Sequence, residues 1–108
     1  MNKRTFNFIT NWQKETFPNS NANSKIVHLK QEVDELQSDV MYNSIDARLE
    51  FADCFILLFG AAKAHGMSYE DICAVIDEKM HINVNRKWGK PDKNGVVNHI
   101  KNETNEPK

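Results

Sequence analysis

The stretch Leu49-Glu-Phe-Ala-Asp-Cys-Phe-Ile-Leu-Leu-Phe59 is apolar except for two acids, Glu50 and Asp53. Apolar side chains occupy every face of the helix that this stretch predicts, as in a helix at the centre of a bundle. We expect Asp53 to be buried there, where an unpaired carboxylate would cost several kcal/mol. The nearest preceding base, Arg48, is five positions away on another helix face, so a metal ion is the favoured counter-charge.

A second pair of acids, Glu32 and Glu35, precedes this stretch in His28-Leu-Lys-Gln-Glu-Val-Asp-Glu-Leu36. Both pairs are spaced i, i+3, which places the two Cβ atoms of a pair about 5–6 Å apart on one helix face. Four carboxylates from two helices form an all-oxygen site of the kind that binds Mg²⁺ or Mn²⁺ beside substrate phosphates. The predicted metal ligands are Glu32, Glu35, Glu50 and Asp53.

The segments before the central helix also predict helices. Aromatic residues indicate a short N-terminal helix that ends near Pro18. Ser24 can cap a long helix over residues 25–42, in which apolar residues recur at steps of three and four. No strand-like alternation is found, and the fold class that we expect is all-α.

The central helix should begin at Asn43 or Ser44, either of which can cap it, and end at Gly66. A fourth helix opens at the capping pattern Ser68-Tyr-Glu-Asp71. The apolar residues of this helix that should face the core are Ile72, Val75 and Ile76.

One face of the fourth helix becomes cationic and amide-bearing toward its end, at Lys79, Asn83 and Arg86. These side chains can hold a triphosphate, with Arg86 forking two phosphate oxygens. Alternatively, the two basic residues interact only with the last carbonyls and the dipole of their helix. Considered alone, the helix favours neither alternative. The four acids on the other helices need counter-charge, and this favours the contacts with phosphate.

The composition excludes several classes of partner. The 108 residues include 14 Lys and Arg against 15 Asp and Glu, a balance without the basic surface that nucleic-acid binding needs. The start of the chain lacks the apolar run of a signal peptide, and the longest apolar stretch is too short to span a bilayer. We therefore expect a cytoplasmic protein without nucleic-acid or membrane partners. It should form one domain over residues 1–100, with a disordered tail at residues 101–108.

These motifs together resemble a known superfamily. Glu32-x-x-Glu35, a 14-residue gap, Glu50-x-x-Asp53 and then Lys79-x-x-x-Asn83-x-x-Arg86 resemble the three-part motif of the MazG-like all-α nucleoside triphosphate pyrophosphohydrolases. The segment Asn85–His99 further resembles the dATP/dGTP diphosphohydrolases of bacteriophages and prophages. The resemblance covers about residues 6–100, most of the chain.

The resemblance implies Mg²⁺-dependent hydrolysis of a nucleoside triphosphate, in particular dATP or dGTP, to the monophosphate and pyrophosphate. It implies a MazG-like four-helix bundle assembled as a homodimer or dimer of dimers. The four acids would hold two to three Mg²⁺ ions, for which Mn²⁺ can substitute, and Lys79, Asn83 and Arg86 would contact the phosphates. Glu35 is our choice for the carboxylate that takes the proton. The apolar faces of residues 51–62 independently indicate an obligate homo-oligomer, because four helices of one small chain cannot cover them all.

Base recognition is expected at two aromatic residues and one histidine. Trp12 and Phe17 precede the acidic helix, as an aromatic pair does in relatives that enclose the nucleobase, and Trp12 can stack on any base. His28 can hydrogen-bond the base or sugar, or orient a carboxylate ligand. The alternatives are that both aromatics are core residues and that His28 is structural.

Other functions are weaker matches to these residues. A catalytically inert, metal-stabilised interaction module would gain nothing from acids in an apolar helix, which should drift to neutral residues. An enzyme of the same fold acting on a pyrimidine or damaged nucleotide remains an alternative. A di-iron carboxylate bundle needs His three positions after a ligating Glu, and neither Glu32 nor Glu50 has one.

Overall fold

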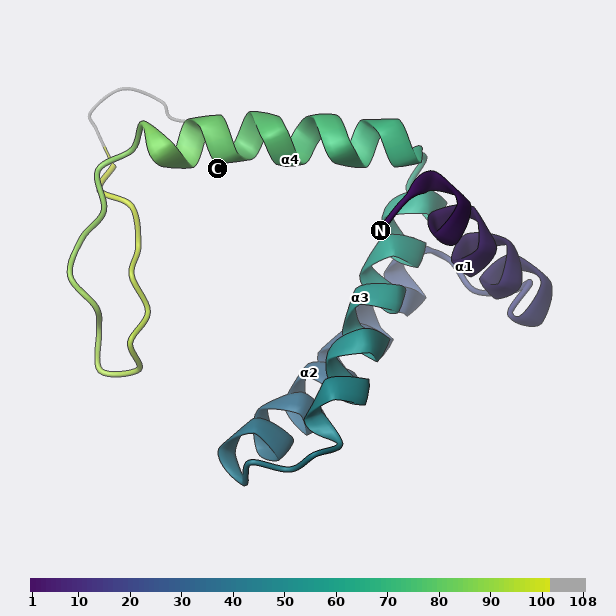
Figure 1. Ribbon diagram of the computed structural model, residues 1–108, viewed down its shortest axis with the longest axis horizontal. Coiled ribbons are helices and arrows are strands. Elements are labelled where there is room, and N and C mark those ends of the chain that lie inside the picture. Colours follow the sequence, from purple (N-terminus) through teal and green to yellow (C-terminus); the bar gives the residue numbers. More distant parts are fainter. Residues whose placement is uncertain (102–108) are drawn as a thin grey trace. The chain divides into compact units, whose positions relative to one another are not determined.

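The computed structural model describes residues 1–101 and is all-helical apart from its loops, as predicted. Its helices are α1 (Lys3–Thr16), α2 (Ala22–Met41), α3 (Ala47–Ala64) and α4 (Tyr69–Val84) (Figure 1). The chain divides into a first unit, Met1–Cys73, and a second unit that begins at Ala74. The predicted disordered tail lies outside the described residues except for Lys101, and the single domain over residues 1–100 stays a prediction.

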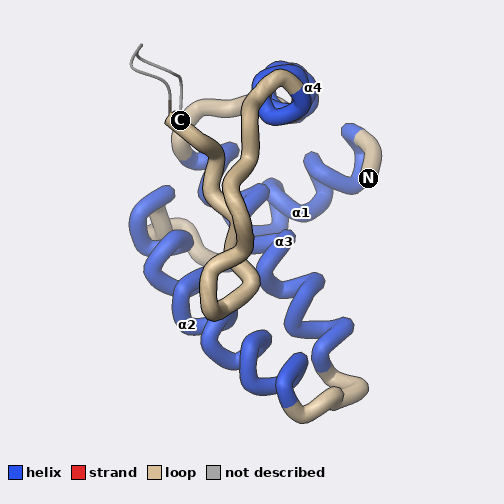
Figure 2. Tube along the Cα trace, turned by 90° about the vertical axis from the view of Figure 1, so that its left-hand side faces the viewer, coloured by secondary structure: helices blue, strands red, loops and turns tan. Residues whose placement is uncertain are grey.

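In the first unit, α3 packs along α2 and also contacts α1, so α3 is the central helix of this unit (Figures 1 and 2). The core is small and lies where α1 meets α3. The ring of Phe6 is fully buried there. It lies 6.1 Å from the ring of Phe59 and 5.7 Å from that of Tyr69, measured between centroids.

The predicted ends of α1 and α3 and the predicted start of α4 are confirmed. Helix α1 ends at Thr16, before Pro18. Gly66 follows α3 with a φ of 102°, the left-handed conformation that glycine adopts without a steric penalty. Ser68 and Asp71 form the expected capping box, in which the Ser68 backbone N–H donates to Asp71 Oδ2 at 2.9 Å and the Asp71 N–H to Ser68 Oγ at 3.1 Å.

The predicted caps of α2 and α3 were wrong. Asn21, not Ser24, is the N-cap of α2, and Ser24 is the third helical residue that closes the box. Neither Asn43 nor Ser44 caps α3, whose first residue follows Asp46. Asn43 instead takes a left-handed conformation with a φ of 53°, which asparagine tolerates better than most residues.

Two predictions of burial were also wrong for the single chain. Asp53 is exposed, and so are its apolar neighbours on α3, Phe51 and Phe55, which therefore do not shield it from solvent. Val75 and Ile76 of α4 are exposed rather than core-facing. Within the described part of the second unit, a loop follows α4, and that unit contains no second helix that could cover these side chains.

The second unit contains most of α4 and the loop after it. An isolated bridge pairs Trp88 with His99, and the Asp92 N–H donates to the Val96 carbonyl at 2.9 Å across the turn between them. The Trp88 indole N–H donates to the carbonyl of Asn83 at 3.0 Å. Residues 88–99 therefore form a hairpin-like loop attached to the end of α4 (Figure 2).

Candidate metal and nucleotide site

The hairpin of α2 and α3 brings three of the four predicted acids together. One carboxylate oxygen each from Glu32, Glu35 and Glu50 lies within 4.8 Å of the others. Glu32 and Glu35 project from one face of α2 because they are one turn apart, and Glu50 faces them from the first turn of α3. Such an oxygen cluster has the size and chemistry of a hard divalent cation site.

Electrostatic repulsion within this cluster is strong. The pKa of Glu50 is raised to about 7 by a hydrogen bond with Glu32, by desolvation and by the negative charges of Glu32, Glu35 and Asp53. Oε2 of Glu50 is buried and has no hydrogen-bond partner among the described residues. A proton on Glu50 therefore supplies the positive charge that a cation would otherwise supply. The donor set fits Mg²⁺ or Mn²⁺.

Asp53 lies one turn beyond Glu50 on α3 and outside the group of three. Its carboxylate is close enough to raise the pKa of Glu50, and together with Glu32 it lines the adjacent cavity. The structure thus places three predicted ligands in one cluster and the fourth beside it.

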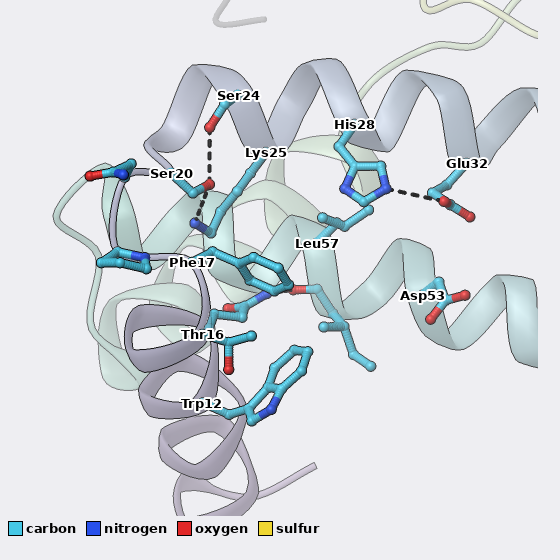
Figure 3. A pocket seen from close by; sticks show the side chains of 14 residues that line it. Trp12, Thr16, Phe17, Ser20, Ser24, Lys25, His28, Glu32, Asp53 and Leu57 are labelled. Atoms are coloured by element: carbon cyan, nitrogen blue, oxygen red, sulfur yellow. Dashed lines mark hydrogen bonds and ion pairs between the residues drawn. The ribbon is translucent and has the colours of Figure 1, made fainter.

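A cavity of about 680 Å³ adjoins the acids within the first unit (Figure 3). Trp12 and Phe17 form an aromatic wall, with their rings edge to face at a centroid distance of 5.5 Å. Each is about half exposed, which contradicts the alternative that they are core residues. Ile56 and Leu57 of α3 add apolar surface. An aromatic and aliphatic wall of this kind suits the flat face of a base.

His28 lines the same cavity. Its Nε2 lies 3.2 Å from Oε1 of Glu32, one turn further along α2. The imidazole can therefore orient this carboxylate, as one of the predicted roles requires. Whether it also contacts a ligand stays a prediction.

The predicted phosphate contacts belong to the second unit. Nζ of Lys79 is buried and has no hydrogen-bond partner in the described part of the chain. A guanidinium nitrogen of Arg86 lies 3.4 Å from Nδ1 of His99. Arg86 lies two residues beyond Val84, the last residue of α4, so the prediction that it shares a helix face with Lys79 and Asn83 was wrong. The helix ends at Val84, in a turn in which the Arg86 N–H donates to the Asn83 carbonyl at 3.3 Å.

Among the polar residues of the cavity wall that sequence reasoning missed, two are buried: Gln13 and Lys25, which are 3% and 8% exposed. Gln13 donates from Nε2 to the Ile56 carbonyl at 3.0 Å. Lys25 donates from Nζ to Ser20 Oγ at 2.8 Å. Lys25 lies near the N-terminus of α2, where the helix dipole disfavours a cation. That conflict is a sequence signal that could have identified it.

Within residues 1–101, no helix combines the length and apolar character needed to cross a membrane.

The profile of the dATP/dGTP pyrophosphohydrolase family matches residues 5–106. A dATP/dGTP diphosphohydrolase of Salmonella phage PMBT28 is 35% identical over 92 residues, which are 85% of this chain. The match spans 29% of that relative's length.

Among solved structures, the cyanophage S-2L MazG-like pyrophosphohydrolase superposes with a TM-score of 0.78 at 26% identity, covering 95% of this chain and 97% of the other. That protein was determined with dGDP and three catalytic Mn²⁺ ions per active site. The resemblance inferred from the motifs is confirmed. By its sequence profile and its fold, the chain belongs to the dATP/dGTP pyrophosphohydrolase family.

Proposed function

We propose that the chain hydrolyses purine deoxynucleoside triphosphates, dATP or dGTP, to the monophosphate and pyrophosphate with Mg²⁺, for which Mn²⁺ can substitute. The observation that carries this proposal is the cluster of Glu32, Glu35 and Glu50 oxygens within 4.8 Å of one another, beside an aromatic-walled cavity. The dGDP and three Mn²⁺ ions of the cyanophage neighbour support it. These substrates are cytoplasmic metabolites, so we place the reaction in the cytoplasm of a bacterium or a phage-infected host.

In this proposal, Glu32, Glu35, Glu50 and Asp53 hold two to three divalent ions. When bound, the ions would polarise the α-phosphate, activate a water molecule and neutralise the leaving pyrophosphate. Glu35 accepts the proton of the attacking water, because it is the exposed member of the three-acid cluster and an exposed carboxylate can pass the proton on to solvent. His28 holds Glu32 in its orientation through the 3.2 Å contact.

The substrate is held at both ends. Trp12 stacks on the base, and Lys79, Asn83 and Arg86 contact the phosphate chain. Nζ of Lys79 supports this role, because a buried ammonium without a hydrogen-bond partner in the described residues gains stability from an anionic ligand.

We also propose that the active form is a homodimer or a dimer of dimers. Phe51, Phe55 and Leu58 of α3 are 46%, 57% and 51% exposed. Apolar side chains clustered in this way on a central helix indicate a surface that another protein covers.

The deciding experiment incubates the protein with each dNTP and NTP and Mg²⁺ or Mn²⁺, and separates the products by ion-exchange chromatography. We expect a deoxynucleoside monophosphate and pyrophosphate in equal amounts, with the purine deoxynucleotides hydrolysed fastest. Reaction in ¹⁸O-labelled water should place the label in the monophosphate, as attack at the α-phosphorus requires. Release of orthophosphate would contradict the proposal. An absence of turnover with every nucleotide would favour the inert metal-stabilised module.

A further inference from the structure

The cavity has a cationic end and an acidic end. Figure 3 shows Lys25 and Ser20 at one end and Glu32 and Asp53 at the other. If the proposed function is correct, the metal ions and phosphates lie at the acidic end, and a nucleotide that extends along the cavity places its base toward Lys25. Any selection of the base by this end of the cavity rests on that orientation.

Lys25 is 8% exposed, and in residues 1–101 no carboxylate lies within ion-pair distance of it. An ammonium group offers three N–H donors and accepts nothing. One of these N–H groups donates to Ser20 Oγ at 2.8 Å. Burying the others without acceptors is costly. The cavity wall therefore carries hydrogen-bond donors that a ligand rich in acceptors would satisfy.

Neighbouring hydroxyl groups fix the position of this ammonium. Ser20 Oγ lies 2.9 Å from Ser24 Oγ, and Ser24 is held by the capping box of α2 through its 2.8 Å contact with the Asn21 N–H. The network ties the lysine to the start of the helix. A donor held in this way can discriminate between ligands, because it cannot swing aside to avoid a mismatched group.

The two purines differ in the group that would meet such a donor. Guanine presents two adjacent acceptors, O6 and N7, whereas adenine presents N7 beside the N6 amino donor. An ammonium can donate to both guanine atoms but opposes the adenine amino group. Trp12 and Phe17 do not discriminate in this way, because stacking accepts any base. We propose that Lys25 is the residue that selects the base, and that it makes the chain prefer dGTP to dATP.

The test compares wild type with Lys25→Met, which keeps the length and apolar stem of the side chain and removes the donors. We expect wild type to favour dGTP in kcat/KM by roughly tenfold or more, the range of one bidentate contact to guanine. The variant should lose this preference, with kcat/KM for dATP changed much less than that for dGTP. Lys25→Arg should retain the preference. Lys30→Met is the matched control, an exposed lysine on the same helix outside the cavity, and should retain it too.

A purely structural role, tying the loop after α1 to α2, would change both substrates alike. An equal loss of dGTP and dATP hydrolysis in Lys25→Met, or a wild-type preference for dATP, would overturn the inference. Calorimetric binding of dGMP and dAMP in Mn²⁺ tests it without turnover. A wild-type preference for dGMP that Lys25→Met abolishes supports the inference even if no triphosphate is hydrolysed, in which case the proposed function alone fails. Equal binding of the two monophosphates by wild type would overturn the inference.

Discussion

At the scale of single residues, Glu50 shows how an acidic cluster alters its own titration. Its pKa is raised to about 7, first by the hydrogen bond with Glu32. At a pH between 4.5, the ordinary pKa of a glutamate, and about 7, Glu50 in the folded chain keeps a proton that it has lost in the unfolded chain. The stability contributed by this proton is fully present below the unfolded pKa and is lost as pH rises through the folded pKa.

We therefore predict that, in EDTA, the free energy of unfolding of wild type falls between pH 5 and pH 8 more steeply than that of Glu50→Gln. The glutamine cannot lose a proton, so its stability lacks this contribution to the slope. Addition of Mn²⁺ at pH 8 should stabilise wild type by replacing the proton with a cation. Denaturant titrations across this pH range measure both effects. Identical slopes for the two proteins would contradict the pKa assigned to Glu50.

Asp53 provides a second prediction at this scale. Because its side chain is exposed in the single chain, Asp53→Asn should change the stability of the metal-free chain by no more than about 0.5 kcal/mol. Because Asp53 is a proposed metal ligand, the substitution should nevertheless lower turnover by at least about 10- to 100-fold. Steady-state kinetics at saturating Mg²⁺ and a thermal melt in EDTA measure the two quantities. Turnover like that of wild type would remove Asp53 from the ligand set.

Gly60 has a steric role against Gln13. A Cβ at Gly60 would overlap the side-chain amide of Gln13, and Gln13 is buried with its amide donating to the Ile56 carbonyl. Displacing the amide should cost about 1–3 kcal/mol, which exceeds the gain of about 1 kcal/mol from alanine's helix propensity. We predict that Gly60→Ala destabilises the wild-type chain but stabilises the Gln13→Ala variant. Chemical denaturation of the four proteins tests this, and destabilisation in both backgrounds would contradict the steric explanation.

At the scale of helices, the sequence predicted the number and order of the elements but not every boundary. Gly66 and the Ser68–Asp71 box were correctly identified because each has no competing signal nearby. The segment before α2, Asn19-Ser-Asn-Ala-Asn-Ser24, offers several residues that can cap a helix. The choice of Asn21 depends on a reciprocal pair of hydrogen bonds with Ser24, which residue preferences alone do not rank.

This boundary yields a prediction for α2. Asn21→Ala should destabilise the chain by about 1 kcal/mol, because it removes the side-chain acceptor for the first turn of the helix. Asn19→Ala, in the same segment but outside the helix, is the matched control and should change stability by less than about 0.5 kcal/mol. Equal effects of the two substitutions, measured by denaturant midpoint, would show that Asn21 does not act as the cap.

At the scale of the whole molecule, burial was the property least accessible from the sequence. The apolar run of residues 49–59 predicts a buried helix, whereas none of these residues is buried in the single chain. The run itself does not say whether the same chain or another copy covers the helix. In the single chain, α3 is covered by α2 and α1 over part of its surface, and Asp53 remains exposed beside Phe51 and Phe55. The spacing of the acids was enough to predict the cluster, because α2 and α3 are consecutive helices that pack side by side.

The proposed assembly can be tested through this uncovered surface. Leu58 is 51% exposed on α3, and Leu58→Glu would place a charge among its apolar neighbours. In a monomer, this substitution at a half-exposed site should be almost neutral, whereas in an oligomer it would bury an unpaired carboxylate and dissociate the copies. Lys63→Glu, at an exposed polar position of the same helix, is the control and should leave the assembly intact. We expect light scattering to report a multiple of 12.5 kDa for wild type and the control, and a smaller mass for Leu58→Glu. A fully active wild-type monomer at micromolar concentration would contradict the assembly, and the exposed apolar surface of α3 would then have to be stable in water.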